Sequence, residues 1–226
     1  MKHMMLSMGA LALLAVSYGF SSQTPTPAPA PAPAPTKTAS TTPTDAEVIK
    51  NQLPSYPLDT CPISGEKLDS KAVNNVKDGH LVRTCCTKCT AKIDAAAIKK
   101  VEDAVVAVQL KTYPMENCLC GAKLGDKTVN HVVGTRLVRC CTPECAGMLD
   151  KDIKTAMTKL DRAYVDAQLK TYKLTTCPAC SAELGKTGEP VNKLYGVTLV
   201  RFCSTPCVAA LDKDPAAILK KVAAAQ

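Results

Sequence analysis

Apolar side chains recur at helical spacing in two stretches of the chain, residues 91–112 and 146–171. In both stretches they lie three to five residues apart, which places them on one face of an α-helix. They are Ile93, Ile98, Val101 and Val105 in the first stretch, and Leu149, Ile153, Met157, Leu160 and Tyr164 in the second. We therefore predict two amphipathic helices.

Three shorter segments predict β-hairpins. Each has a Val-Asn pair, a two-residue turn and then the sequence Leu-Val-Arg. Two-residue turns of the Asp-Gly or Gly-X kind have a twist that suits a β-hairpin. The turns are Asp78-Gly79, Gly134-Thr135 and Gly196-Val197.

The hairpins belong to a segment that occurs three times, beginning at Tyr56, Tyr113 and Tyr172. Each copy follows a Gln-Leu pair and runs through a cysteine-bearing turn, the hairpin, and an Ala- and Lys-rich stretch. Pro215 suits the first turn of a new helix, so we expect a short helix break at this point of each copy. The pattern predicts an α+β fold of three tandem small Cys-rich units, each a knuckle, a β-hairpin and a helix, joined by amphipathic helices. The predicted units are residues 45–112 with a leading helix, 113–171 and 172–226.

A different pattern marks the start of the chain. An apolar run from Leu6 to Phe20 follows Lys2 and precedes small polar residues, which is the layout of a cleavable secretory signal. We predict a signal peptide over residues 1–22, cleaved between Gly19 and Ser22. The run is too short to span a bilayer comfortably, although an uncleaved anchor is the alternative.

Residues 23–44 alternate Pro with Ala and Thr, which predicts an extended Pro/Ala-rich linker. Together with the signal peptide, this linker leads us to expect a protein that is secreted or held in the periplasm or cell envelope. We expect no stable membrane span after signal cleavage.

The formal net charge of +8 does not by itself indicate a nucleic-acid-binding protein, because the chain has 2 Phe, 6 Tyr and no Trp. Aromatic platforms for bases are therefore scarce. We expect the scattered Lys and Arg residues to form solvated helix faces. Binding to an anionic surface is the alternative, and we do not expect nucleic acid as a partner. The Asp, Glu and Ser residues show no paired-acid or nucleophile arrangement, so we do not expect an enzyme.

The chain has 13 cysteines. In the third copy Cys177 and Cys180 precede the hairpin, and Cys203 and Cys207 follow it. The first pair is expected on a tight knuckle and the second at a helix start, where the helix N-terminus favours thiolate. Four thiolates brought together in this way form a tetrahedral cage of the structural zinc type. A unit of fewer than about 70 residues usually needs such a staple beyond its apolar core.

The third copy, CPACSAELGKTGEPVNKLYGVTLVRFCSTPCVAALDKDPAAIL, resembles the YHS and TRASH-type heavy-metal-binding domains. These are small treble-clef-like modules with a Cys knuckle, a hairpin ending in aromatic-Cys-Ser-x-x-Cys, and a helix opening near Asp-Pro. In that family the cysteines bind zinc, copper or related soft ions. The resemblance implies metal ligation by Cys177, Cys180, Cys203 and Cys207, and likewise by Cys120, Cys141 and Cys145.

The other two copies depart from this pattern. The second has the shorter spacing Cys118-x-Cys120, which still offers two thiols beside those that follow the hairpin. The first has Ser64 where the second knuckle thiol is expected. Its aligned cysteines are Cys61, Cys85 and Cys89.

The fourth donor of the first copy is left open by the sequence. Cys86 and His80 are the candidates, and without either the site is three-coordinate. Such a site suits Cu(I), which accepts few soft ligands, better than zinc, which prefers four donors. The alternative is a copy that has kept its fold and lost its metal. Outside these sets, we expect Cys140 to be a small buried hydrophobe and His131 to be polar surface.

We expect an exported protein that binds zinc- or copper-class ions at one thiolate site per repeat. It would act as a metal carrier or buffer, or as a metal-stapled scaffold. The expected partners are metal ions, with another exported protein as a further option. The alternative is an extracytoplasmic disulfide-stabilised interaction protein without bound metal, because secreted cysteines ordinarily form disulfides. A thiol redox role is the third option. The odd number of cysteines and the vicinal pairs at 85–86 and 140–141 favour metal binding.

Overall fold

The computed structural model describes residues 43–149, 151–186 and 188–225. The predicted signal peptide and the predicted linker up to residue 42 lie outside the described residues. Within the described part of the chain, no helix combines the length and the apolar character needed to cross a membrane.

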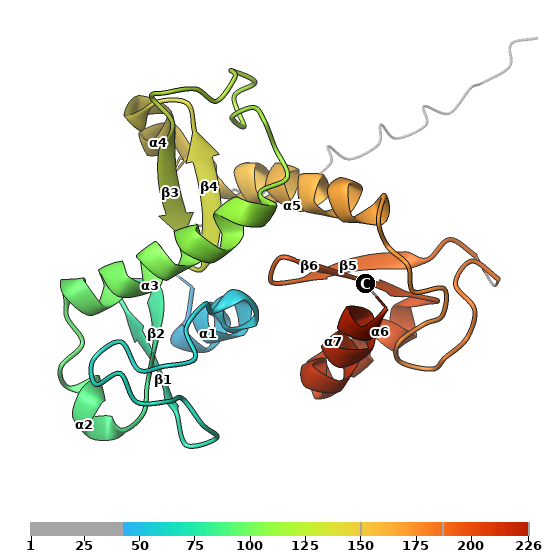
Figure 1. Cartoon of the computed structure of the whole chain (residues 1–226), viewed down its shortest axis with the longest axis horizontal. Helices are drawn as coiled ribbons and strands as arrows, with labels where there is room; N and C mark the ends of the chain where they lie inside the picture. Colours follow the sequence, from blue (N-terminus) through green and yellow to red (C-terminus); the bar gives the residue numbers. More distant parts are fainter. Residues whose placement is uncertain (1–42, 150, 187, 226) are drawn as a thin grey trace, which may run out of the picture. The chain divides into compact units, whose positions relative to one another are not determined.

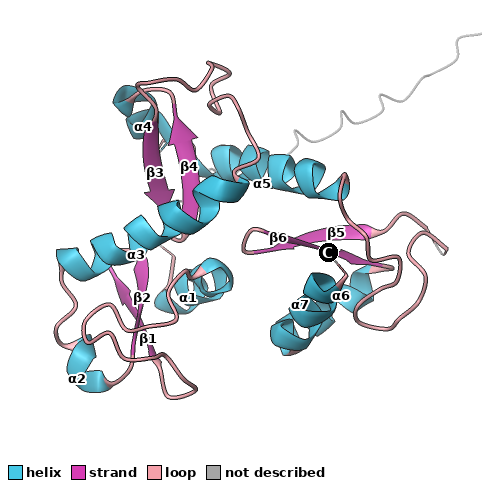
Figure 2. Ribbon diagram, in the orientation of Figure 1, coloured by secondary structure: helices cyan, strands magenta, loops and turns pink. Residues whose placement is uncertain are grey.

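Over the described residues the fold is mixed α+β, with three two-stranded antiparallel hairpins separated by helices (Figures 1 and 2). The hairpins are β1 (Val73–Lys77) with β2 (His80–Thr84), β3 (Val129–Val133) with β4 (Arg136–Cys140), and β5 (Val191–Tyr195) with β6 (Thr198–Phe202). All three have the same register, in which the valine that opens the first strand lies opposite the last residue of the second. The predicted hairpins are therefore confirmed.

Each hairpin is followed by a short helix and then another helix. The pairs are α2 (Thr87–Thr90) with α3 (Ala95–Gln109), α4 (Pro143–Leu149) with α5 (Ile153–Leu169), and α6 (Thr205–Lys213) with α7 (Pro215–Ala224). The second helix of each pair begins after an aspartate whose carboxylate accepts a hydrogen bond from a backbone N–H of the first turn, an arrangement that stabilises a helix start by about 1 kcal/mol. These aspartates are Asp94, Asp152 and Asp214. The predicted helix break is thus present after all three hairpins.

Both faces of each hairpin are covered. Adjacent residues of a strand point to opposite faces, yet Leu137 and Val138 of β4 are both fully buried. Val138 packs in a core with Leu160 and Tyr164 of α5, whereas Leu137 points to the opposite face, on the side of α3, which contacts both strands of this hairpin. The equivalent Leu-Val pairs of β2 and β6 are equally buried.

A glutamine at or next to the end of the preceding helix holds each hairpin turn. Its side-chain Nε2 donates to a carbonyl oxygen of the turn, and its Oε1 accepts from a backbone N–H of the second strand. The bonds join Gln52 of α1 (Asp45–Gln52) to Gly79 and Leu81, Gln109 to Thr135 and Leu137, and Gln168 to Val197 and Leu199, at 2.7 to 2.9 Å. The Gln-Leu pair of each sequence copy therefore has a structural role.

The tyrosine that opens each copy is bound to the same hairpin. Its hydroxyl accepts a hydrogen bond from the backbone N–H of the arginine in the Leu-Val-Arg sequence, at 3.0 to 3.1 Å. The 3₁₀ turns η1 (Leu53–Ser55) and η2 (Leu110–Thr112) lie between the first two helix ends and their tyrosines. In each copy these bonds hold the loop that carries the cysteines before the hairpin against the second strand, which leads to the cysteines after it.

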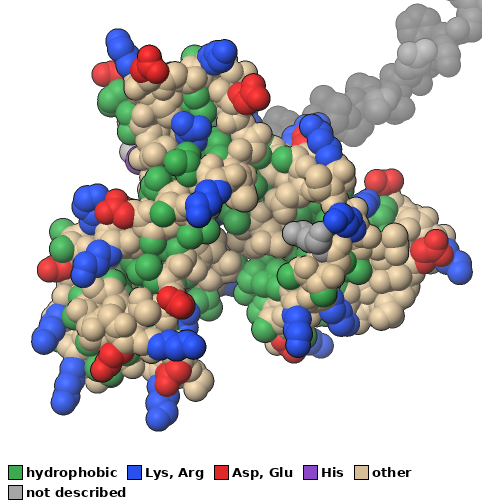
Figure 3. Space-filling view, in the orientation of Figure 1, with side chains coloured by type: hydrophobic (Ala, Val, Ile, Leu, Met, Phe, Trp, Pro, Cys, Tyr) green, Lys and Arg blue, Asp and Glu red, His purple; other side chains and the backbone are tan. Residues whose placement is uncertain are grey.

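Basic side chains do not gather in one place on the face shown in Figure 3. Lys and Arg project singly, with Asp and Glu among them. This distribution agrees with the expectation of solvated helix faces.

Candidate metal centres

Three groups of cysteine thiols lie at the ends of the hairpins that are remote from the turns. Within each group all sulfur atoms lie within 4.8 Å of one another. We call them the first cluster (Cys61, Cys85 and Cys89), the second cluster (Cys118, Cys120, Cys141 and Cys145) and the third cluster (Cys177, Cys180, Cys203 and Cys207). The structure therefore brings together the eleven cysteines that the sequence pattern singled out.

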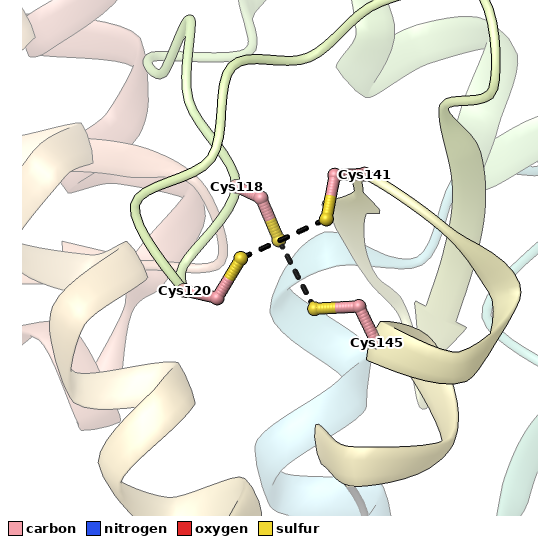
Figure 4. Close-up of side chains that lie close together, drawn as sticks. All are labelled: Cys118, Cys120, Cys141 and Cys145. Atoms are coloured by element: carbon pink, nitrogen blue, oxygen red, sulfur yellow. Dashed lines mark hydrogen bonds between the residues drawn. The ribbon is translucent and has the colours of Figure 1, made fainter.

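Each cluster is assembled from two sides. Figure 4 shows the second cluster, in which Cys118 and Cys120 come from a loop, Cys141 follows β4, and Cys145 lies on α4. The loop is closed by a hydrogen bond from the Cys118 N–H to the Ala122 carbonyl oxygen, at 2.8 Å. The cysteine that opens each of the other two loops makes the equivalent bond, at 2.7 Å. The knuckles predicted from the cysteine spacing are therefore turns with their own backbone hydrogen bonds.

One residue of each knuckle has a left-handed backbone. In the first two knuckles it is a glycine, Gly65 or Gly121, with φ of 77° and 95°. The third knuckle has Ser181 at this position, with φ of 63°. Glycine adopts this conformation without the steric penalty that other residues incur, so Ser181 is strained where its counterparts are not.

The sulfur separations fit a metal cage. A tetrahedral zinc site with Zn–S bonds of about 2.3 Å places its sulfur atoms about 3.8 Å apart. In the third cluster, Cys180, Cys203 and Cys207 are separated by 3.5 to 3.7 Å. In the second, Cys118 lies 3.4 Å from Cys145 and Cys120 lies 3.7 Å from Cys141. All 13 cysteines are free thiols, and the donor set and spacing of these two clusters suit a soft divalent ion.

The first cluster has an oxygen at its fourth corner. The Ser64 Oγ lies 3.3 Å from the Cys85 Sγ. Cys180 stands in the same relation to Cys203 in the third cluster, as does Cys120 to Cys141 in the second. Ser64 therefore occupies the place of the missing thiol.

The two fourth-donor candidates of the first copy differ in position. The Cys86 Sγ lies 3.8 Å from the Cys85 Sγ, although it does not belong to the group of mutually close sulfurs. His80 begins β2 beside the turn, opposite Lys77, and a strand of this length separates it from Cys85 by roughly 16 Å. Its Nδ1 lies 3.8 Å from a carboxylate oxygen of Glu102 instead. The structure therefore places His80 away from the first cluster.

Two residues outside the clusters behave differently from each other. Cys140 is completely buried in the core beside Val138, in the place that Phe202 takes in the third hairpin. Burial raises the pKa of its thiol to about 12, so the interpretation of Cys140 as a small hydrophobe holds. His131 is half-buried on β3, opposite Val138, rather than plain polar surface.

The first cysteine of each knuckle is prepared to be a thiolate. Burial by itself would raise the pKa of Cys61, but the Ser64 backbone N–H and hydroxyl, with the Cys85 and Ile63 N–H groups, outweigh it and lower the pKa to about 6. The pKa values of Cys118 and Cys177 are lowered to about 7, because backbone N–H groups of the knuckle and of the post-hairpin cysteine outweigh burial in the same way. The thiolate is the form that binds metal.

In each cluster at least one further cysteine has a raised pKa and so resists losing its proton. In the second cluster the Cys118 sulfur, followed by burial, raises the pKa of Cys145. In the third, the pKa of Cys203 rises to about 12, because the thiols of Cys180 and Cys207, with burial, outweigh the Ser204 hydroxyl. In the first, the Glu66 carboxylate makes the largest contribution to the raised pKa of Cys85. Neighbouring negative charges oppose one another, and a bound cation offsets this repulsion.

Sequence reasoning did not find Glu66. It contributes to the raised pKa of the Cys85 thiol, its backbone N–H donates to the Ser64 Oγ at 3.4 Å, and its backbone oxygen closes the first knuckle. The residues that close the other two knuckles are Ala122 and Ala182. Alignment of the first and third knuckle sequences on Cys61 and Cys177 sets Glu66 against Ala182, two residues after the position where Ser64 replaces a thiol.

No protein-family model, curated protein or solved structure matches this chain. The cluster geometry and the residue pattern are therefore the basis for a functional interpretation.

Proposed function

We propose that this protein is an exported metal-binding protein with three tandem units, each holding one soft ion of the zinc or copper class at a thiolate site. The observation that carries the proposal is the gathering of eleven thiols into three groups whose sulfur atoms lie within 4.8 Å of one another. Separations of 3.4 to 3.7 Å within the two complete groups fit a tetrahedral zinc–thiolate cage.

In this proposal the units are of the YHS and TRASH kind. The order of their parts supports this assignment: each unit has a cysteine knuckle, then a hairpin, then a helix whose first turn carries the last cysteine. The apolar run and the Pro/Ala-rich stretch before residue 45 support export. The protein acts as a binding protein rather than an enzyme, since a four-thiolate cage has no open coordination position for a substrate.

Two roles agree with such sites. A carrier or buffer requires ions that exchange, whereas a scaffold requires ions that stay and hold the units folded. The hairpins are small and their cores contain few aromatic side chains, so a bound ion contributes to stability in either role.

The test is elemental analysis of the protein purified from its own compartment, combined with counting of free thiols under denaturing conditions. We expect two to three zinc-class ions per chain and most thiols unoxidised after the metal is removed. A protein without metal whose cysteines are nearly all paired would instead be a disulfide-stabilised interaction protein, and the proposal would fail.

A further inference from the structure

The first cluster differs from the other two at one corner. The Ser64 hydroxyl takes the place that a cysteine sulfur takes in the second and third clusters. Firm zinc ligands in proteins are thiolates, imidazoles and carboxylates. A neutral hydroxyl does not replace the missing charge, so this corner needs another donor if the first cluster is to bind a divalent ion.

A glutamate adjoins that corner through its backbone. Glu66 follows Ser64 by two residues, and its backbone N–H donates to the Ser64 Oγ at 3.4 Å. The hydrogen bonds that close the knuckles place Glu66 where the other two copies have alanine. The first copy has thus lost a thiol and gained a carboxylate within the same knuckle.

We propose that Glu66 supplies the fourth ligand of the first cluster and makes it a zinc site with three thiolates and one carboxylate. This inference rests on the proposed function and specifies one of its sites. The carboxylate does not belong to the group of donors that lie within 4.8 Å of one another. Glu66 is exposed, so a change of its side-chain rotamer is free of packing constraints and carries an oxygen toward the sulfurs.

The donor set decides the ion and its behaviour. A carboxylate is a normal zinc ligand and a poor one for Cu(I), which prefers soft donors. The first cluster is therefore a zinc-class site rather than the three-coordinate Cu(I) site that the missing thiol alone suggests. A ligand on an exposed, rotatable side chain leaves the ion more readily than a thiolate held in a knuckle, so this site exchanges its ion first.

The experiment compares zinc retention in full-length variants challenged with increasing concentrations of a chelator. We expect the wild-type protein to hold three zinc ions and to release one of them well before the other two. Glu66→Gln should weaken retention of that first ion by on the order of 10-fold to 100-fold, a loss that even partners outside the ligand shell can cause. Cys89→Ser should abolish the same ion, which assigns it to the first cluster.

Two further variants separate ligand loss from damage to the fold. Adding Ser64→Cys to Glu66→Gln completes four thiolates and should restore retention to the level of the other two sites. Glu183→Gln is the matched control, because Glu183 is an exposed knuckle glutamate of the third copy. It should leave all three ions unaffected.

Glu66→Gln with the wild-type release profile would overturn the inference, since Ser64 or Cys86 would then complete the site. A wild-type protein that leaves the first cluster free of zinc but fills it with Cu(I) would overturn it as well. Both results would leave zinc in the second and third clusters. Absence of zinc from those two clusters would instead reject the proposed function.

Discussion

At the scale of single residues, two tyrosines near the second cluster form a natural comparison. Tyr113 and Tyr164 pack edge to face with ring centroids 6.4 Å apart. The Tyr113 hydroxyl accepts a hydrogen bond from the Arg139 N–H at 3.0 Å. The Tyr164 hydroxyl is buried and has no hydrogen-bond partner among the described residues. The Tyr113 hydroxyl therefore stabilises the fold, whereas burial of the Tyr164 hydroxyl costs stability.

We expect Tyr113→Phe to lower the free energy of unfolding by about 1 kcal/mol, because it removes one hydrogen bond and leaves a backbone N–H without its acceptor. Tyr164→Phe should leave that free energy unchanged or raise it by up to about 1 kcal/mol, because it removes a buried hydroxyl that nothing satisfies. Denaturant unfolding of both metal-loaded variants measures the difference. Equal losses in the two variants would contradict this assignment.

Residues also show where sequence reasoning reached its limit. The eleven clustered cysteines were identifiable because their spacing around a hairpin is a local pattern. Glu66 was not, because nothing in the sequence of one copy distinguishes a glutamate beside the thiol group from any other exposed glutamate. For His80 the sequence was sufficient, since strand geometry separates the turn end of β2 from the end that carries Cys85.

At the scale of elements, the hairpins and helices were predictable because their signals are local: turn residues, helical spacing and a proline at a helix start. The attachment of each hairpin to the preceding helix was not. The Gln-Leu repeat was visible in the sequence, but its hydrogen bonds span 26 to 31 residues. Only the folded chain shows that the glutamine amide completes the backbone bonding of the turn.

Gln109 allows this attachment to be tested. It is 2% exposed and bonds both Thr135 and Leu137, so Gln109→Ala leaves a buried carbonyl and a buried N–H without partners. We expect a loss of about 2 to 4 kcal/mol in the free energy of unfolding, measured by denaturant unfolding. Asn51→Ala, at an exposed residue of α1, is the control and should change it by less than about 0.5 kcal/mol. A loss below about 1 kcal/mol for Gln109→Ala would show that the turn does not depend on the amide.

At the scale of the whole molecule, the proposed ions are expected to stabilise the parts that surround them. Structural zinc contributes on the order of 10 to 16 kcal/mol to the folding of small zinc-finger peptides, which exceeds what a core of this size supplies. Loss of one ion should therefore destabilise the hairpin and helices around its cluster more than the rest of the chain.

We expect Cys203→Ser to remove the ion of the third cluster and to abolish amide protection mainly within residues 177–225. Hydrogen exchange followed by mass spectrometry measures this loss segment by segment. Cys86→Ser is the control, because Cys86 lies outside the three groups of mutually close sulfurs. Full protection of residues 177–225 in Cys203→Ser would mean that the third hairpin folds without its ion.

The helix α3 belongs to two hairpins at once. It begins just after the first cluster, and its last residue, Gln109, holds the turn of the second hairpin. A fragment that begins at Tyr113 would therefore lack Gln109, the residue that holds the turn of the β3–β4 hairpin. If such a chain lengthens by duplication, the copied segment has to start within a helix and end within the next one, so that every new hairpin inherits its anchor.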